Sequence, residues 1–307
     1  VVFLRYGVGV IDGVQLNSEG ANLVSDLDIG FGLGELEERA FLEVRYIDGE
    51  PGIENVTVTL TGTTDAGANV NQNTTTGVGG LYSFNNLFPG DYEVTFTLPS
   101  GYEFTYQNQG GNDANDSDPD PNTGVTATFN LPSGGTNLDM DAGLFRYAQI
   151  GNFAFLDCND NGIQDGDDPI VGASVTLSGT DGGGNAVNLN TTTNASGIYG
   201  FSNLRPGTYT LTFGMPASPT GLTFGQKNQG SDDNLDSDID ETTGSTDAIS
   251  LISNENNDHT DAGYKDITPP TVNPASDQTV QCDGSGNTTE LNNWLANNGG
   301  ATATDNI

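Results

Sequence analysis

Apolar and polar residues alternate with a period of two in several short stretches of the chain, and these stretches occur twice. The clearest pair is residues 92–98 and 209–215, where every second residue is aromatic or aliphatic. This period predicts β-strands with one buried face, and hardly any segment has a helical period, so we expect an all-β protein. The expected inward-facing residues are Val56, Val58, Leu60, Tyr92, Val94, Phe96 and Leu98, and then Ala173, Val175, Leu177, Tyr209, Leu211, Phe213 and Met215.

The repetition extends to the turns between strands. Residues 82–92 match residues 199–209, and each copy holds a Pro-Gly pair. Such a pair suits a type II turn, because proline fixes φ and glycine supplies a positive φ. The two pairs are Pro89-Gly90 and Pro206-Gly207.

An acidic motif recurs at the length of a domain. It stands at Asp28, Asp141 and Asp261, at intervals of 141 − 28 = 113 and 261 − 141 = 120 residues. Such an interval indicates tandem domains rather than a solenoid, whose period is about 20–50 residues. Each module is expected to be a β-sandwich of roughly seven short strands. The expected boundaries are 1–31 for the tail of a preceding module, 32–147 and 148–266 for two modules, and 267–307 for the start of another domain.

The charge balance is strongly acidic. Lysine and arginine together number 7 against 42 aspartate and glutamate residues, and the net charge is −35. Nucleic acid and anionic membrane surfaces both need a basic face, so neither is an expected partner, and no apolar run is long enough to insert into a membrane. So large an excess of one sign repels itself in the folded state unless counter-ions lie among the carboxylates.

Residues 157–168 have the spacing of a twelve-residue calcium loop. Ca²⁺ takes six to eight oxygen ligands, a glycine at position 6 allows the sharp turn, and position 7 contributes its backbone carbonyl. Glycine at position 6 is Gly162, and the expected ligands are Asp157, Asn159, Asn161, Ile163 (through its carbonyl), Asp165 and Asp168. Asp168 departs from the glutamate usual at position 12, and its shorter side chain weakens the expected site.

A second acidic cluster follows an Asn-Gln-Gly motif in both modules. Carboxylates two residues apart in an extended segment project to the same face, and like charges so close cost free energy unless a cation lies between them. Two interpretations fit equally well: a solvated acidic loop, or a second calcium site completed by Asp141 or Asp261. The candidates in the first module are Asp113, Asp116 and Asp118, and those in the second are Asp233, Asp236, Asp238 and Asp240.

Catalysis is not expected. The chain has one histidine, His259, in a tail whose other copy lacks it, and no serine or cysteine has an evident base. The paired carboxylates have metal-ligand spacing and no aromatic cleft of the kind that binds sugars. The two cysteines, Cys158 and Cys282, do not make a disulfide framework.

These motifs together resemble one family. The order is Ile-Gly-Asn-Phe at 150–153, the loop at 157–168, the motif at 199–209, Asn-Gln-Gly with its acidic run, and Asp-Ala-Gly at 261–263. Over residues 148–266 the chain resembles the B-type repeat of serine-aspartate (Sdr) surface proteins, which is related to the B repeats of collagen adhesins. The resemblance implies a prealbumin-like or Ig-like β-sandwich with bound calcium, repeated along an extended stalk.

Residues 32–147 resemble the same repeat with one departure. When Gly34 is matched to Gly151, the positions of the calcium loop hold Ala40, Leu42 and Val44, and only Glu50 keeps a carboxylate. Either the first site of this module has been lost, or the stretch 35–43 is unreliable.

From residue 268 the pattern changes. Residues 269–272 are expected to form a linker, and residues 277–306 resemble the opening of an Ig-like repeat of large bacterial adhesins. A second cysteine usually follows in that family, and Ile307 stands there instead, so the partner of Cys282 stays open. Trp294 is expected to be a core residue of a short helical turn.

We therefore expect a calcium-stabilised structural segment of a secreted, cell-surface bacterial adhesin or filament, taken from inside a longer protein. Its expected partners are neighbouring modules of the same chain, with identical subunits in a filament or host-surface ligands as open possibilities. A carbohydrate- or protein-binding module is the alternative, and an exposed aromatic platform would distinguish it.

Overall fold

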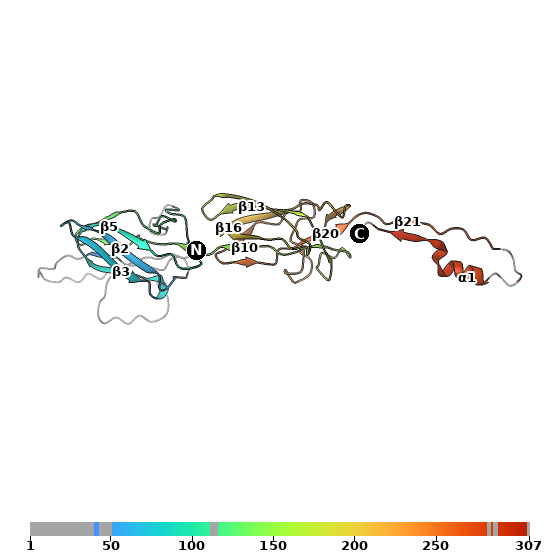
Figure 1. Ribbon diagram of the computed structural model, residues 1–307, viewed down its shortest axis with the longest axis horizontal. Coiled ribbons are helices and arrows are strands. Elements are labelled where there is room, and N and C mark those ends of the chain that lie inside the picture. Colours follow the sequence, from blue (N-terminus) through green and yellow to red (C-terminus); the bar gives the residue numbers. More distant parts are fainter. Residues whose placement is uncertain (1–39, 43–50, 111–115, 281–283, 285–287, 306–307) are drawn as a thin grey trace, which may run out of the picture. The chain divides into compact units, whose positions relative to one another are not determined.

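The computed structural model describes residues 40–42, 51–110, 116–280, 284 and 288–305. The chain folds as two compact units, Val1–Tyr147 (unit one) and Ala148–Ile307 (unit two). The described residues are mainly β-strand in both units, so the expectation of an all-β protein is confirmed (Figure 1).

Residues 148–266 of unit two form a sandwich of short strands. One sheet has the order β14-β13-β16-β18, and it faces strands arranged as β12-β11-β20-β17 and β15-β10-β19. The strands are β10 (Ala148–Ile150), β11 (Ala154–Leu156), β12 (Asp168–Pro169), β13 (Ser174–Asp181), β14 (Ala186–Thr192), β15 (Phe201–Leu204), β16 (Gly207–Phe213), β17 (Leu222–Phe224), β18 (Ile249–Leu251), β19 (Asn256–Asn257) and β20 (Ala262–Asp266). These eleven strands exceed the roughly seven expected, because many are only two or three residues long.

The core of this sandwich follows from the period-two pattern. Val175 and Leu177 on β13 and Leu211 on β16 are fully buried, and they face Tyr264 and Leu156 on the opposite layer. Each such side chain contributes about 1.5–3 kcal/mol when it leaves water. The alternating hydroxyl and amide residues on the outer face of β13 and β14 stay in contact with solvent.

Unit one repeats the arrangement. Its larger sheet has the order β3-β2-β5-β7, and the three-stranded sheet β4-β1-β8 and the pair β6-β9 complete the described strands. The elements are β1 (Ala40–Leu42), β2 (Thr57–Thr64), β3 (Asn69–Thr75), the 3-10 helix η1 (Val78–Gly80), β4 (Phe84–Leu87), β5 (Gly90–Phe96), β6 (Glu103–Phe104), β7 (Phe129–Leu131), β8 (Thr136–Asn137) and β9 (Leu144–Phe145). Figure 1 shows β2, β3 and β5 side by side.

Most of the predicted core residues are buried, but the prediction was wrong for one residue just beyond the end of each of two strands. Tyr92, Phe96 and Tyr209 are at most 2% exposed, as the alternation predicts. Leu98 is 39% exposed and Met215 is 45% exposed, because β5 ends at Phe96 and β16 at Phe213. The alternating pattern in the sequence continues beyond the last residue of each strand. A residue beyond the strand end has no partner strand, so the pattern no longer decides which way its side chain points.

The two Pro-Gly glycines have a different role from the expected one. Gly90 and Gly207 are not among the described residues with positive φ, whereas Asn86 (φ 61°) and Asn203 (φ 57°) are. Gly90 begins β5 beside Thr63, and a Cβ there would lie 2.4 Å from the Thr63 carbonyl oxygen; Gly207 has the same 2.4 Å approach to its partner strand. Glycine is therefore required for close packing of backbones and not for the turn.

The C-terminal residues of unit two form two short strands and two short helices. β21 (Thr271–Asn273) pairs antiparallel with β22 (Thr302–Thr304), between which lie α1 (Thr288–Ala296) and the 3-10 helix η3 (Asn298–Gly300). Thr271 and Val272 were expected in a linker, so that expectation was wrong. Trp294 lies on α1, is half-buried, and donates its Nε1–H to the Ser276 carbonyl over 2.9 Å. Cys282 lies outside the described residues.

Candidate metal sites

The loop at residues 157–168 connects β11 to β12 in unit two and closes around the carboxylate of Asp157. Asp157 is 2% exposed. Its Oδ1 accepts the Asn161 N–H over 3.1 Å, and its Oδ2 accepts the Gly162 N–H over 2.7 Å. Gly162 has φ 72°, in the left-handed region that favours glycine, as position 6 of such a loop requires.

Three further expected ligands of this loop lie close to one another. The Nδ2 groups of Asn159 and Asn161 both donate to Asp165 Oδ2, over 3.1 and 3.0 Å. These side chains share one network with Asp157, since Asn161 also bonds to it through its backbone. Their own amide oxygens accept backbone N–H groups, Asn159 Oδ1 from Asn161 over 3.1 Å and Asn161 Oδ1 from Ile163 over 2.8 Å. The local sequence thus gathers carboxylate and amide oxygens of the kind that Ca²⁺ takes.

The remaining two expected ligands of the loop, Ile163 and Asp168, have different surroundings. Ile163 is half-buried, and its Cδ1 would be 3.2 Å from a Cβ at Gly230 in a neighbouring loop. Asp168 begins β12 with an exposed side chain. Asp167, to which the twelve-residue spacing assigns no ligand role, has an Oδ2 that is buried and has no hydrogen-bond partner among the described residues. Burial raises the pKa of Asp167, with the charges of Asp165 and Asp157 adding to the effect.

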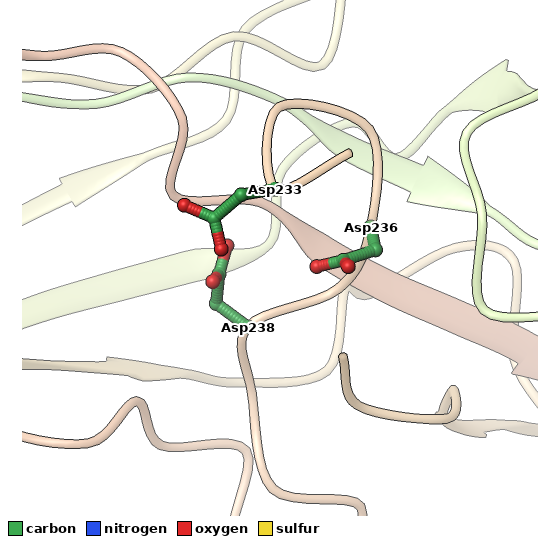
Figure 2. A group of neighbouring side chains, drawn as sticks. All are labelled: Asp233, Asp236 and Asp238. Atoms are coloured by element: carbon green, nitrogen blue, oxygen red, sulfur yellow. The ribbon is translucent and has the colours of Figure 1, made fainter. Parts of the chain in front are cut away.

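A second group of carboxylates lies on the segment between β17 and β18. Asp233, Asp236 and Asp238 each place an oxygen within 4.8 Å of the others. Figure 2 shows the carboxylates of Asp233 and Asp238 pointing toward each other and that of Asp236 turned toward them. Asp236 is 6% exposed, and its Oδ1 is buried without a hydrogen-bond partner among the described residues.

Asp261 lies beside this group and is fully buried. Its backbone N–H donates to Asp238 Oδ2 over 2.6 Å, while its own carboxylate accepts the Phe153 N–H over 3.1 Å and Asn152 Nδ2 over 3.2 Å. Burial raises the pKa of Asp261 to about 8 and that of Asp238 to about 6, and neighbouring carboxylates contribute in both cases. A cation among these carboxylates would lower their pKa values, because it favours the charged form.

Asp240 is placed in a turn. Its Oδ1 accepts the backbone N–H groups of Thr242 and Thr243 over 2.9 and 2.8 Å and the Thr243 hydroxyl over 3.1 Å. These bonds lower the pKa of Asp240. The role that the structure shows for this carboxylate is to fix the turn that leads into β18.

The two acidic loops of unit two are docked on each other. Gln164 N–H donates to the Leu235 carbonyl over 2.6 Å, and Ser237 N–H donates to the Gly162 carbonyl over 3.2 Å. Ile163 and Asp236 form an isolated antiparallel bridge. A Cβ at Gly162 would lie 2.5 Å from Gln229 Cγ, so the glycine also permits this close approach.

Unit one also contains the second acidic group. Asp116, Asp118 and Asp141 are all buried, at 6, 7 and 0% exposure. Asp141 N–H donates to Asp118 Oδ2, and Asp118 N–H donates to the Asp141 carbonyl over 2.9 Å, which repeats the geometry of unit two. Asp113 lies outside the described residues.

The strand pairing corrects the expected register of unit one. β1 pairs with β4 and β8 in the way that β10 pairs with β15 and β19, so Ala40 corresponds to Ala148 and Leu42 to Ile150. Ala40 and Leu42 are therefore not calcium-loop positions. From these strands to the next matched pair, Ala173 and Val56, the distance is 173 − 150 = 23 residues in unit two and 56 − 42 = 14 in unit one. Unit one is nine residues shorter where unit two carries the loop.

Comparison with known proteins places both units in one family. The SdrD B-like domain family matches residues 47–144 and 148–264. The serine-aspartate repeat-containing protein D of Staphylococcus aureus (strain Newman) is 35% identical over 218 residues, which cover 70% of this chain and 15% of that protein. The serine-aspartate repeat-containing protein F of Staphylococcus epidermidis (strain ATCC 12228 / FDA PCI 1200) is 36% identical over 219 residues, covering 71% of this chain and 12% of that protein.

The solved structures add little beyond this. The minor pilin GBS52 of Streptococcus agalactiae gives a TM-score of 0.29 at 15% identity and covers 74% of this chain and 88% of that one. A score this low supports no inference about function. Among the residues that the structure describes, no helix is both long and apolar enough to cross a membrane.

Proposed function

The chain belongs to the SdrD B-like domain family, and from that premise we propose that its two units are a calcium-stabilised structural segment of a secreted bacterial surface adhesin or filament. The observation that supports calcium is the pair of docked acidic loops in unit two. There Asp157, Asp236 and Asp261 are buried, and Asp236 Oδ1 has no hydrogen-bond partner among the described residues.

The physical reason is the cost of these carboxylates without a cation. Removing a charge from water is expensive unless an opposite charge compensates it, and several like charges within 4.8 Å add repulsion. The described part of unit two has two lysines near these loops. Lys265 pairs with Asp160 over 2.9 Å and Lys227 with Asp247 over 2.7 Å, so neither ammonium pairs with Asp236, Asp238 or Asp261 in the described contacts. A divalent cation would supply the missing charge.

Calcium fits the proposed setting as well as the ligands. Sites in extracellular modules typically bind with dissociation constants of about 10⁻⁴–10⁻³ M, which suffices where calcium is plentiful. Because the ion binds only the folded state, it adds stability by mass action. The chain has few basic residues and many short strands, so bound ions would contribute stability that a larger apolar core would otherwise provide.

We propose a non-catalytic role. His259 pairs with Asp233 and contacts no serine or cysteine in the described interactions. The alternative of a sugar-binding module has less support, because the aromatic residues of the paired strands, Tyr92, Phe96, Tyr209 and Phe213 among them, lie in the core. Adhesive partners and assembly into a filament belong to the whole protein, of which the staphylococcal relatives match this chain over 15% or less of their length.

Thermal unfolding of the 307-residue chain tests the calcium proposal. At a free calcium concentration of one hundred times the dissociation constant, a single site adds about 2.7 kcal/mol, and the midpoint should rise by about 10 °C over the chelator-treated protein. The variants Asp165→Asn and Asp233→Asn should shrink this rise. Asp247→Asn is the matched control, because its side chain is 90% exposed and pairs only with Lys227 in the described contacts. A midpoint that is the same with calcium and with chelator contradicts the proposal.

A further inference from the structure

β14 is the outermost strand of the larger sheet of unit two, and one of its edges pairs with no described strand. Its seven residues pair with β13 in unbroken register, and none of them is buried. Sheets are usually protected at such an edge by a charge, a proline, a bulge or a very short strand. β18, at the opposite edge of this sheet, has only three residues, whereas β14 has none of these protections.

The free edge of β14 presents backbone groups that point away from the sheet. Two bonds at the ends of the ladder fix its alternation: Asp181 N–H donates to the Asn185 carbonyl over 3.0 Å, and Thr193 N–H donates to the Ala173 carbonyl over 2.9 Å. Because bonded pairs alternate along an antiparallel ladder, the odd-numbered residues of β14 bond to β13. The residues whose N–H and C=O groups point outward are therefore Ala186, Asn188, Asn190 and Thr192.

Leu189 gives this edge an apolar centre. It pairs with Leu177 of β13, whose side chain is fully buried, but Leu189 itself is 41% exposed, because β13 covers only one side of it. The matching strand of unit one, β3, has the exposed Gln72 at this position, since the two ladders are displaced by 189 − 72 = 117 residues. The sequences of the two strands differ otherwise only at their first residue. Unit two therefore has an uncovered apolar position in the middle of its edge, where unit one has an amide.

The charge of the chain favours one kind of partner for this edge. The net charge is −35, so two copies repel each other overall, and a basic partner is attracted by the acidic loops and gains nothing from a neutral strand. β14 contains no charged residue. A two-fold axis places the same strand of a second copy against it, and these two neutral strands can approach without direct repulsion between their side chains.

We propose that β14 is a self-association surface that pairs antiparallel with β14 of a second copy about a two-fold axis. In the symmetric register Leu189 lies opposite the same leucine of the second copy, and Asn188 lies opposite Asn190. The outward backbone groups then bond to each other, and the two leucines form a non-hydrogen-bonded pair, in which side chains lie closest. The larger sheets of the two copies become one continuous sheet. This inference goes beyond the proposed function and does not depend on bound calcium.

Sedimentation of the 307-residue chain in calcium tests this pairing. A strand edge makes a small interface of the weak class, so we expect a reversible dimer with a dissociation constant on the order of 10⁻⁴ M. Raising the NaCl concentration from about 0.05 to about 0.5 M should tighten the dimer about fivefold or more, because salt screens the repulsion between the two copies. A chain that stays monomeric at about 1 mM in high salt overturns the inference.

Two substitutions of Leu189 locate the surface. Leu189→Lys sets two ammonium groups against each other at the two-fold axis and should weaken the dimer about tenfold or more. Leu189→Gln installs the residue of unit one and should weaken it about threefold or more, because it removes the apolar contact. Gln72→Lys is the matched control, since it makes the same change of charge on β3, and it should leave the dissociation constant within about twofold. A dimer that Leu189→Lys does not weaken, or that Gln72→Lys weakens equally, overturns the assignment to β14.

A disulfide tests the register itself. In a chain whose natural cysteines, Cys158 and Cys282, are both changed to serine, Leu189→Cys places a thiol at the two-fold axis. Residues of a non-hydrogen-bonded pair have Cα atoms about 4.5 Å apart, which lies within the range of a disulfide. Air oxidation should therefore give a covalent dimer on non-reducing gels about tenfold faster than for Gln72→Cys in the same background. Equal rates for these two variants overturn the pairing.

Discussion

The two units share a scaffold and differ in one loop. β2 pairs with β3 and β5 in unit one with the same register as β13 with β14 and β16 in unit two, each residue being displaced by 174 − 57 = 117 positions. Yet unit one has nine fewer residues between its first described strand and β2 than unit two has between β10 and β13. The difference in length falls where unit two carries the loop at 157–168.

The second acidic group belongs to the scaffold itself. In both units a serine hydroxyl on the acidic segment accepts the N–H of the glycine two residues beyond the buried aspartate. Ser117 accepts from Gly143 over 3.1 Å and Ser237 accepts from Gly263 over 3.0 Å. The comparison indicates that the carboxylates of this segment are held in place by backbone pairing, whether or not the first loop is present. Removing the metal should therefore affect the two units unequally.

The largest expected effect is a pH dependence in chelator-treated protein. Burial raises the pKa of Asp261 to about 8 and that of Asp238 to about 6, above the usual value near 4. A carboxyl group whose pKa is higher in the folded state favours folding while protonated. Its contribution is therefore present below about pH 4 and is lost as the pH rises through about 6 and about 8.

Unit two without metal should consequently lose on the order of a few kcal/mol of stability between about pH 5 and about pH 8.5, and calcium should remove most of that loss. Urea unfolding at several pH values, with chelator and with calcium, measures this. The Asp261→Asn variant should flatten the pH profile of the chelated protein. A chelated protein that grows more stable over this pH range would contradict the assignment of these two carboxyls.

The next effect concerns the loop at 157–168 of unit two. Asp157→Ala removes the acceptor of the Asn161 and Gly162 N–H groups, and it should cost about 2–4 kcal/mol in calcium. Only the unfolding transition of unit two should move, since the sequence of unit one is nine residues shorter in this region. Asp247→Asn is the control, because that side chain is 90% exposed and outside the loop, and its change should alter stability by about 0.5 kcal/mol or less. Differential scanning calorimetry separates the transitions, and a shift in both would break the comparison.

The shared scaffold was easier to predict from the sequence than the difference between the units. Val58, Leu60 and Val175 are buried because a period of two matches the pleat of a strand, which is a local property. The register of β1 depends on its pairing with β4 and β8, and no local pattern near Ala40 encodes that pairing.

Spacing in the sequence predicted which residues of one segment come together, but it did not predict contacts between distant segments. Asp233, Asp236 and Asp238 come together because they lie on one segment, whereas Asp240 is turned away by its bonds to Thr242 and Thr243. The docking of residue 163 on residue 236 joins segments 236 − 163 = 73 residues apart, so spacing could not reveal it. Asp167 was missed because the twelve-residue pattern assigns position 11 no ligand.

A smaller effect tests whether the two scaffolds are equivalent. Gly90→Ala and Gly207→Ala each place a Cβ 2.4 Å from a carbonyl oxygen of the neighbouring strand, on Thr63 and Thr180. The strands would have to separate, so each variant should lose about 1–3 kcal/mol. The two losses should agree within about 1 kcal/mol, because the shortest contact, to a threonine carbonyl oxygen, is the same in both units. Gly67→Ala, where a Cβ meets no atom within 4 Å, controls for the change of residue alone, although its φ of 82° adds some strain of its own. Unequal losses would show that the sandwiches are packed differently.

The smallest expected effect comes from the ion pair that ties the loop of unit two to β20. Lys265 Nζ lies 2.9 Å from Asp160 Oδ1, with side chains 23% and 51% exposed, and Gln226 Nε2 donates to the Asp160 carbonyl over 2.7 Å. An exposed pair of this kind contributes about 0.2–1 kcal/mol, so Asp160→Asn should lower stability by no more than that, and less in high salt. Calcium affinity should stay within about threefold of the parent, because the bond from Gln226 to the backbone still holds residue 160. If Asp160→Asn instead weakened calcium binding tenfold, Asp160 would itself be part of the site, and the loop would have to be rebuilt around a carboxylate that its twelve-residue spacing directs away from the ion.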